Sequence, residues 1–152
     1  MQKFDLKNVR LAVAGLGYVG LPLAAEFSKK IPVIGYDVSQ KRIIELKTSL
    51  DLTGELDAQE LSGLKNCDFT IDPEMLHKAN VVIVTVPTPI DKNKIPNLDH
   101  LKNISEVIGS GLCEGDLVIY ESTVYPGVTE EICVPILQKI SGLKFNEDFF
   151  VG

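Results

Sequence analysis

Residues 9–20 run Val9-Arg10-Leu11-Ala12-Val13-Ala14-Gly15-Leu16-Gly17-Tyr18-Val19-Gly20. The first half is an apolar run typical of a buried β-strand, and the second half is a G-x-G-x-x-G turn. In this motif Gly15 allows the tight turn, Gly17 lets the backbone approach a pyrophosphate, and Gly20 lets the next helix pack closely. The segment predicts the strand, turn and helix that open a dinucleotide-binding fold.

The residues after the turn support this interpretation. A helix is predicted from near Tyr18, and its free N–H groups and dipole would face the phosphates. Its apolar positions are Val19, Leu23, Ala24 and Phe27. The next strand, 32–36, ends on Asp37, which can accept hydrogen bonds from the adenosine ribose. Because a carboxylate there repels the extra phosphate of NADP, NAD is the expected cofactor.

Arg42 complicates this prediction, since an arginine nearby can accommodate a 2′-phosphate. It falls on a helix predicted from Ser39 to Lys47, with Ser39 as the N-cap. There it either covers the adenine face or is a solvated helix charge, and both alternatives stay open. The polar stretch 51–55 that follows is either a ligand-facing insertion or a surface connection, and its composition favours the second.

Strand and helix patterns alternate over the rest of the chain, which predicts one domain, 1–152. The expected fold is Rossmann-like and doubly wound α/β, with a mostly parallel sheet and helices on both faces. The continuously apolar run 80–86 predicts a central strand. The other expected elements are a short helix from 57, strand 68–71, a helix from Asp72-Pro73 to Lys78, a loop over 90–97, helix 98–110, strand 116–120 and helix 128–140.

Ligands of such sheets bind at the carboxyl ends of the strands. Two strand ends carry hydroxyls, in Pro87-Thr88-Pro89 and in Ser122-Thr123. These hydroxyls suit hydrogen bonds to a nicotinamide ribose and to a substrate-bound water. The alternative is that the prolines only terminate a strand and that Ser122 and Thr123 cap the next helix.

Bulk properties exclude several classes of protein. A net charge of −6 argues against a general nucleic-acid binder. No apolar run is long enough to span a membrane, and residues 1–5 do not resemble a signal peptide, so the expected location is cytoplasmic. Cys67, Cys113 and Cys133 lack metal-ligand spacing and are expected to be reduced and mostly buried, with no metal site. His77 and His100 are expected to be surface residues.

Together, Gly15-Leu16-Gly17-Tyr18-Val19-Gly20-Leu21-Pro22, Asp37 with Arg42, Val86-Pro87-Thr88-Pro89 and Tyr120-Glu121-Ser122-Thr123-Val124 resemble the amino-terminal domain of the UDP-sugar 6-dehydrogenases. The resemblance covers essentially the whole chain. The stretches 51–55 and 120–135 are similar to the bacterial Vi-antigen branch, which oxidises UDP-N-acetylglucosamine or UDP-N-acetylgalactosamine for surface polysaccharides.

The resemblance implies two NAD-dependent oxidations of a sugar hydroxymethyl group to a carboxylate, through a cysteine thioester. It places Gly15, Gly17, Tyr18 and Val19 at the pyrophosphate and includes Gly20 among the cofactor-binding residues. It also places Asp37 and Arg42 at the ribose, Pro87 and Thr88 on the nicotinamide side, and Ser122 and Thr123 near the reaction centre. Thr123, which matches a threonine that holds the catalytic water, is the one expected catalytic residue.

The family's chain continues into a helical dimerisation region and a second α/β domain with the nucleophilic cysteine. We therefore expect a cofactor domain that alone binds NAD weakly and without turnover, from a homo-oligomeric enzyme whose UDP-sugar contacts lie mostly elsewhere. The alternatives are a UDP-glucose 6-dehydrogenase, a hydroxyacid or sugar-phosphate dehydrogenase, and a stand-alone NAD-sensing domain.

Overall fold

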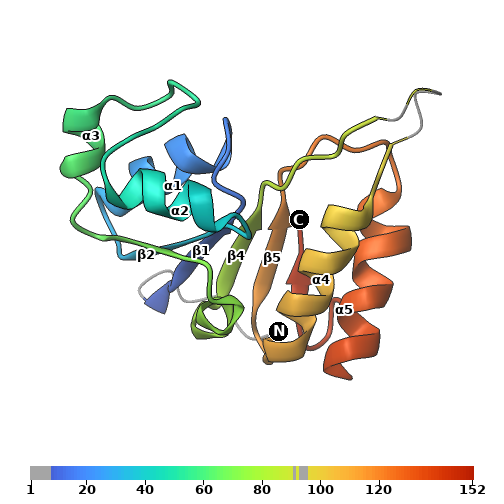
Figure 1. Cartoon of the computed structure of the whole chain (residues 1–152). Coiled ribbons are helices and arrows are strands. Elements are labelled where there is room, and N and C mark those ends of the chain that lie inside the picture. The colour runs from blue at the N-terminus through green and yellow to red at the C-terminus, as the bar shows by residue number, and fades with distance from the viewer. Residues whose placement is uncertain (1–7, 91, 93–95) are drawn as a thin grey trace.

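The computed structural model describes residues 8–90, 92 and 96–152. Residues 1–5 therefore lie outside the described residues. So do residues 91 and 93–95 of the loop expected over 90–97. Within the described ranges, parallel strands form one sheet in the order β3-β2-β1-β4-β5-β6 (Figure 1). The strands are β1 Leu11–Ala14, β2 Val33–Tyr36, β3 Cys67–Thr70, β4 Val81–Val84, β5 Leu117–Tyr120 and β6 Phe150–Val151.

Helices cover both faces of this sheet, as the sequence predicted. One group consists of α1 Gly20–Ser28, α2 Gln40–Lys47 and α3 Ala58–Ser62. The second group consists of the 3₁₀ helix η2 Pro73–Lys78, α4 Asp99–Gly111, the π-helical turn η3 Thr129–Cys133 and α5 Val134–Ser141. Figure 1 shows the two groups on opposite sides, with α4 and α5 packed side by side.

The alternation of side chains along the strands divides the core between the two faces. Leu11 and Val13 of β1 pack in a cluster with apolar residues of α1, α2 and α3. Ala12 and Ala14 belong to a second cluster with α4, η3 and α5. All four residues of β4 are buried, which confirms the expected central strand.

The strand order creates the place for a ligand. β1 pairs with β2 on one side and with β4 on the other. The chain therefore leaves β1 and β4 toward opposite halves of the sheet, and a crevice opens between their carboxyl ends. The glycine turn follows β1 at this point, and the Pro87-Thr88-Pro89 segment follows β4.

Three details differ from the sequence-based expectations. Helix α1 begins at Gly20 rather than near Tyr18. The helix expected over 128–140 opens with a π-helical turn. The two-residue edge strand β6 was not expected, because it is too short to carry a periodic pattern. No helix in the described part of the chain is long and apolar enough to cross a membrane.

Candidate functional site

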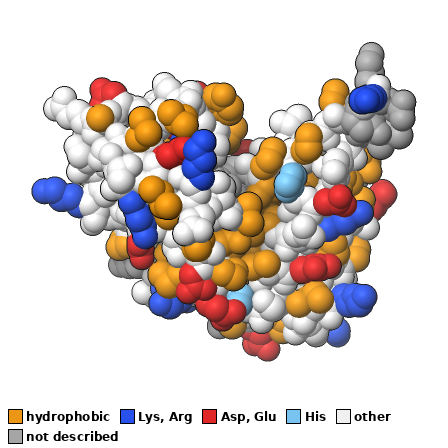
Figure 2. All heavy atoms as spheres, in the orientation of Figure 1, with side chains coloured by type: hydrophobic (Ala, Val, Ile, Leu, Met, Phe, Trp, Pro, Cys, Tyr) orange, Lys and Arg blue, Asp and Glu red, His pale blue; other side chains and the backbone are white. Residues whose placement is uncertain are grey.

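A cleft of about 880 Å³ opens at the carboxyl edge of the sheet. One wall comes from the glycine turn, α2 and the loop after it, and the other from α4. Figure 2 shows the hollow, with hydrophobic side chains along its floor. With the exception of Gly20, every residue that the sequence analysis placed at the cofactor lines it: Gly15, Gly17, Tyr18, Val19, Asp37, Arg42, Pro87, Thr88, Ser122 and Thr123.

The three glycines of the turn have distinct structural roles. Gly15 has a φ of +102°, which favours glycine, and a Cβ there would lie 2.9 Å from the carbonyl oxygen of Thr85. A Cβ on Gly20 would lie 1.7 Å from the carbonyl oxygen of Gly15. A Cβ on Gly17 would meet no atom within 4 Å, because that side faces open space.

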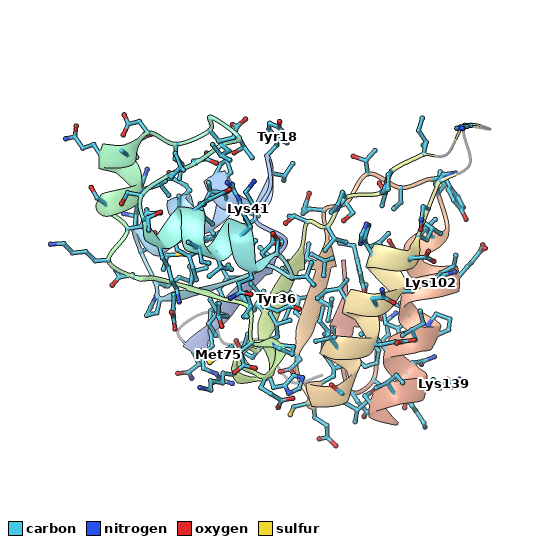
Figure 3. All side chains as sticks on the ribbon, in the orientation of Figure 1. Tyr18, Tyr36, Lys41, Met75, Lys102 and Lys139 are labelled. Carbon is cyan, nitrogen blue, oxygen red and sulfur yellow. The ribbon has the colours of Figure 1, made fainter. Side chains whose placement is uncertain are left out.

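This geometry fits a dinucleotide. The open side of Gly17 leaves room for a pyrophosphate against the backbone, beside the first turn of α1. Tyr18 and Val19, 70% and 54% exposed, project from the turn beside this space. Tyr18 stands at the top of the turn in Figure 3, and Lys41 lies on the α2 side of the cleft.

Asp37 follows β2 and uses both carboxylate oxygens to hold backbone. Its Oδ2 accepts a hydrogen bond from the N–H of Leu16 at 2.9 Å, and its Oδ1 accepts one from the N–H of Ser39 at 2.8 Å. Ser39 in turn caps α2, as predicted, by accepting from the N–H of Arg42. Asp37 therefore couples the glycine turn to the start of α2.

Arg42 is not a solvated helix charge, and that alternative is wrong. The residue is only 9% exposed. Its Nη1 lies 2.8 Å from Oδ1 of Asp51, and its Nε donates to the carbonyl oxygen of Leu16 at 2.7 Å. Burial raises the pKa of Asp51, but hydrogen bonds from Thr53, Leu56 and Arg42 outweigh this and hold that pKa well below its ordinary value.

The stretch 51–55 is also more than a surface connection. Leu52 and Thr53 line the cleft, although composition had favoured a connection without a ligand contact. The Asp51–Arg42 pair connects this loop to α2. Composition does not reveal such a contact between a helix and the loop that follows it.

The strand-end hydroxyls join the loops that follow β4 and β5. The Thr88 hydroxyl donates to the carbonyl oxygen of Thr123 at 2.6 Å, and the Ser122 hydroxyl donates to that of Val86 at 2.7 Å. Neither Ser122 nor Thr123 caps the next helix, which begins at Thr129 after Val128. The capping alternative is therefore wrong.

Sequence reasoning missed the α4 wall of the cleft, formed by His100, Asn103, Ile104 and Val107. The signal was present, since this spacing puts the four residues on one face of a helix. His100 is exposed, as expected. His77 is half-buried instead, because its ring packs between Glu74 and α4, with Nε2 3.1 Å from the carbonyl oxygen of Val107.

The cysteines are free thiols with different exposure. Cys133 is buried and Cys67 is half-buried, but Cys113 is exposed, contrary to the expectation that the thiols are mostly buried. Burial, with the nearby Asp68 carboxylate, raises the pKa of Cys67 to about 12. Among the residues that the structure describes, no three His, Cys, Asp or Glu side chains are grouped to hold a metal ion.

Comparison with known proteins agrees with this geometry. Residues 9–152 match the NAD-binding domain of the UDP-glucose/GDP-mannose dehydrogenase family. A UDP-N-acetyl-D-glucosamine 6-dehydrogenase of Pseudomonas aeruginosa is 58% identical over 147 residues, which cover 97% of this chain and 35% of the relative. The Salmonella typhi enzyme of the same name is 51% identical over 149 residues, covering 98% and 35%.

Among solved structures, the UDP-D-ManNAc dehydrogenase of Pyrococcus horikoshii superposes with a TM-score of 0.85 at 34% identity, covering 93% of this chain and 35% of that one. The chain therefore spans about a third of the length of the relatives that it matches. The match to the family model nevertheless extends over nearly all of the chain, and it includes the glycine turn, Asp37 and both strand-end segments. The chain belongs to the UDP-glucose/GDP-mannose dehydrogenase family, as its NAD-binding domain.

Proposed function

We propose that this chain is the cofactor-binding part of an NAD-dependent 6-dehydrogenase that oxidises a UDP-N-acetylhexosamine to the uronate. The main observation in support of the cofactor site is the cleft between the carboxyl ends of β1 and β4. There the backbone at Gly17 faces open space near Asp37. The two relatives at 58% and 51% identity are both UDP-N-acetyl-D-glucosamine 6-dehydrogenases, which supports a UDP-N-acetylhexosamine as the substrate in preference to UDP-glucose. The family match likewise favours a dehydrogenase over a stand-alone sensor.

In this proposal, bound NAD would accept the hydride in each of two successive oxidations. Backbone at Gly15, Gly17, Tyr18 and Val19 binds the pyrophosphate, which the close packing at Gly20 makes possible. Asp37 binds the adenosine ribose, while Arg42 supports that side of the cleft. Pro87, Thr88 and Ser122 lie toward the nicotinamide.

Thr123 is the proposed catalytic residue of the chain. Its carbonyl oxygen is held by the Thr88 hydroxyl, which fixes the backbone. Within the described part of the structure, its own hydroxyl group has no hydrogen-bond partner, and the residue is exposed at the cleft. That hydroxyl is therefore available to hold the water that hydrolyses the acyl intermediate.

The nucleophile and most sugar contacts are proposed to lie outside these 152 residues, in a cytoplasmic homo-oligomer that serves surface polysaccharide synthesis. The match covers only 35% of each of the two relatives, so most of their length corresponds to no residue of this chain. We expect the chain alone to bind NAD in preference to NADP and to oxidise no UDP-sugar.

Calorimetric titration of the chain with NAD and NADP tests the cofactor site. Turnover of the full-length enzyme with UDP-N-acetylglucosamine, UDP-N-acetylgalactosamine and UDP-glucose tests the substrate. The absence of NAD binding by a folded chain, or a clear preference of the enzyme for UDP-glucose, contradicts the corresponding part of the proposal.

Thr123→Ala in the full-length enzyme is expected to lower kcat more than NAD affinity. A loss of NAD affinity with unchanged kcat would instead make Thr123 a cofactor contact.

A further inference from the structure

Asp51 carries a carboxylate whose side chain is 0% exposed. Its Oδ1 accepts from Nη1 of Arg42 at 2.8 Å, and from the hydroxyl and N–H of Thr53 at 2.6 and 2.9 Å. Its Oδ2 accepts from the N–H groups of Glu55 and Leu56 at 2.9 and 3.1 Å. A single buried side chain therefore determines both the shape of the loop over 51–56 and the position of Arg42.

Each nitrogen of the Arg42 guanidinium has a partner within the protein. Its Nε donates to the carbonyl oxygen of Leu16 at 2.7 Å, and its Nη2 lies 3.4 Å from the Thr53 hydroxyl. Nη1 faces Asp51 and also lies 3.9 Å from a carboxylate oxygen of Glu45. The positive charge of Arg42 is thus balanced inside the protein before any ligand arrives.

This network ends on the glycine turn. Leu16, between Gly15 and Gly17, donates its N–H to Asp37 and accepts from Arg42 at its carbonyl oxygen. Asp51 therefore acts on the turn through Arg42, without lining the cleft itself. It also holds Leu52 and Thr53, which do line the cleft.

We propose that Asp51 is a positioning residue that orders the dinucleotide site and sets its preference for NAD over NADP. It does so by holding the glycine turn and the 51–56 loop, and by neutralising Arg42. A free guanidinium beside the ribose favours a 2′-phosphate, whereas a guanidinium paired with a buried carboxylate does not. The inference rests on the proposed function, because it requires NAD to occupy this cleft.

Asp51→Asn tests the proposal, because the variant keeps the size of the side chain and removes its charge. Dissociation constants for NAD and NADP are measured by calorimetry on the chain. We expect NAD to bind about tenfold more weakly, and the ratio of the NADP constant to the NAD constant to fall roughly tenfold, the worth of one charge-assisted contact. Asp57→Asn is the matched control, since Asp57 is exposed, caps α3 and has no contact with Arg42.

The double variant Arg42→Gln with Asp51→Asn removes both buried charges together, so it is expected to fold even where the single variant does not. In the parent, Arg42 is paired with Asp51 and so neither favours nor disfavours a 2′-phosphate. The double variant is therefore expected to keep the parent's ratio of the NADP dissociation constant to the NAD dissociation constant. Amide hydrogen exchange at Leu16, Glu55 and Leu56 without ligand is expected to be faster in it.

Each outcome has a definite consequence. A folded Asp51→Asn chain with the parent's NADP/NAD ratio overturns the inference. A double variant that loses NADP affinity selectively overturns it as well, since Arg42 then binds the 2′-phosphate in the parent. If the folded parent chain binds no NAD, the proposed function fails instead.

Discussion

At the scale of single residues, Gly17 and Gly20 separate the two requirements of the turn, which are ligand access and packing. Gly20 lies against the carbonyl oxygen of Gly15, while Gly17 faces open space. We predict that Gly20→Ala costs about 1–3 kcal/mol of stability or prevents folding, because backbone must move to admit the methyl group. Gly17→Ala is expected to keep the parent's Tm while it weakens NAD binding.

Thermal unfolding and calorimetric titration of the two variants check this contrast. Gly54→Ala is not a suitable control, since its φ of +76° adds strain of its own. Gln59→Ala, at an exposed position of α3 that does not line the cleft, is a better one. Equal losses of stability in Gly17→Ala and Gly20→Ala would contradict the assignment of separate roles.

Asp37 combines a structural task with the proposed contact to the ribose. Asp37→Ala removes the acceptor for the N–H groups of Leu16 and Ser39 as well as the ribose contact. We predict that NAD binding weakens by about 1.5–3 kcal/mol, as for hydrogen bonds to a charged group, with a measurable fall in Tm. Calorimetry and thermal unfolding measure the two effects, with the exposed Asp68→Ala as the control. An unchanged NAD affinity would mean that the ribose lies elsewhere.

The three thiols are predicted to differ in reactivity, because the thiolate is the reactive form. Cys113 is exposed, whereas burial raises the pKa of Cys133 and raises that of Cys67 to about 12. A disulfide reagent at pH 8 is therefore expected to modify one thiol per native chain rapidly and all three in urea. This rapid modification is expected to be absent in Cys113→Ser. A fast reaction at Cys67 would contradict the packing around β3.

At the scale of elements, a hydroxyl pair links α4 to β5. The Ser105 hydroxyl donates to the carbonyl oxygen of Leu101 at 2.7 Å and lies 2.6 Å from the Tyr120 hydroxyl. Burial raises the pKa of Tyr120 although the bond to Ser105 lowers it, so the phenol stays neutral. We predict a loss of about 1 kcal/mol for Tyr120→Phe, and more for Ser105→Ala, which leaves the half-buried phenol of Tyr120 without this partner.

Urea unfolding of both variants measures these losses. Ser62→Ala controls for the intrinsic helix propensity of alanine, because Ser62 is an exposed serine whose hydroxyl bonds back to the carbonyl oxygen of Gln59 within α3. If Ser105→Ala were no less stable than Ser62→Ala, the hydroxyl pair would contribute nothing to the joint between α4 and β5.

Elements were predictable from sequence where local signals sufficed. The glycine turn, the Ser39 cap and the continuously apolar β4 depend on neighbours in the chain, and all three were confirmed. The π-helical turn and the edge strand β6 were missed, since each depends on tertiary packing over a few residues. The same holds for the site: Asp37 was recognisable beside a motif, whereas the role of Asp51 depends on a contact with another segment.

At the scale of the whole molecule, the Asp51–Arg42 network links the stability of the fold to pH. The pKa of Asp51 lies below its ordinary value of about 3.9 in the folded chain, so its ionised form favours folding. That contribution is complete above the unfolded-state pKa and is lost as the pH falls toward the folded-state pKa. Burial raises the pKa of Asp116, which acts in the opposite direction.

Comparison of two proteins isolates the contribution of Asp51. Asp116 is present in both the parent and Asp51→Asn, so its effect cancels in their difference. We therefore predict that the gap in the free energy of unfolding between them is largest near pH 6 and shrinks by pH 3, as the parent loses the benefit of the charge. Urea titrations at both pH values measure the gap, with Asp57→Asn as the control. A gap that stays constant, or widens on acidification, would mean that the buried carboxylate does not stabilise the fold as an ion.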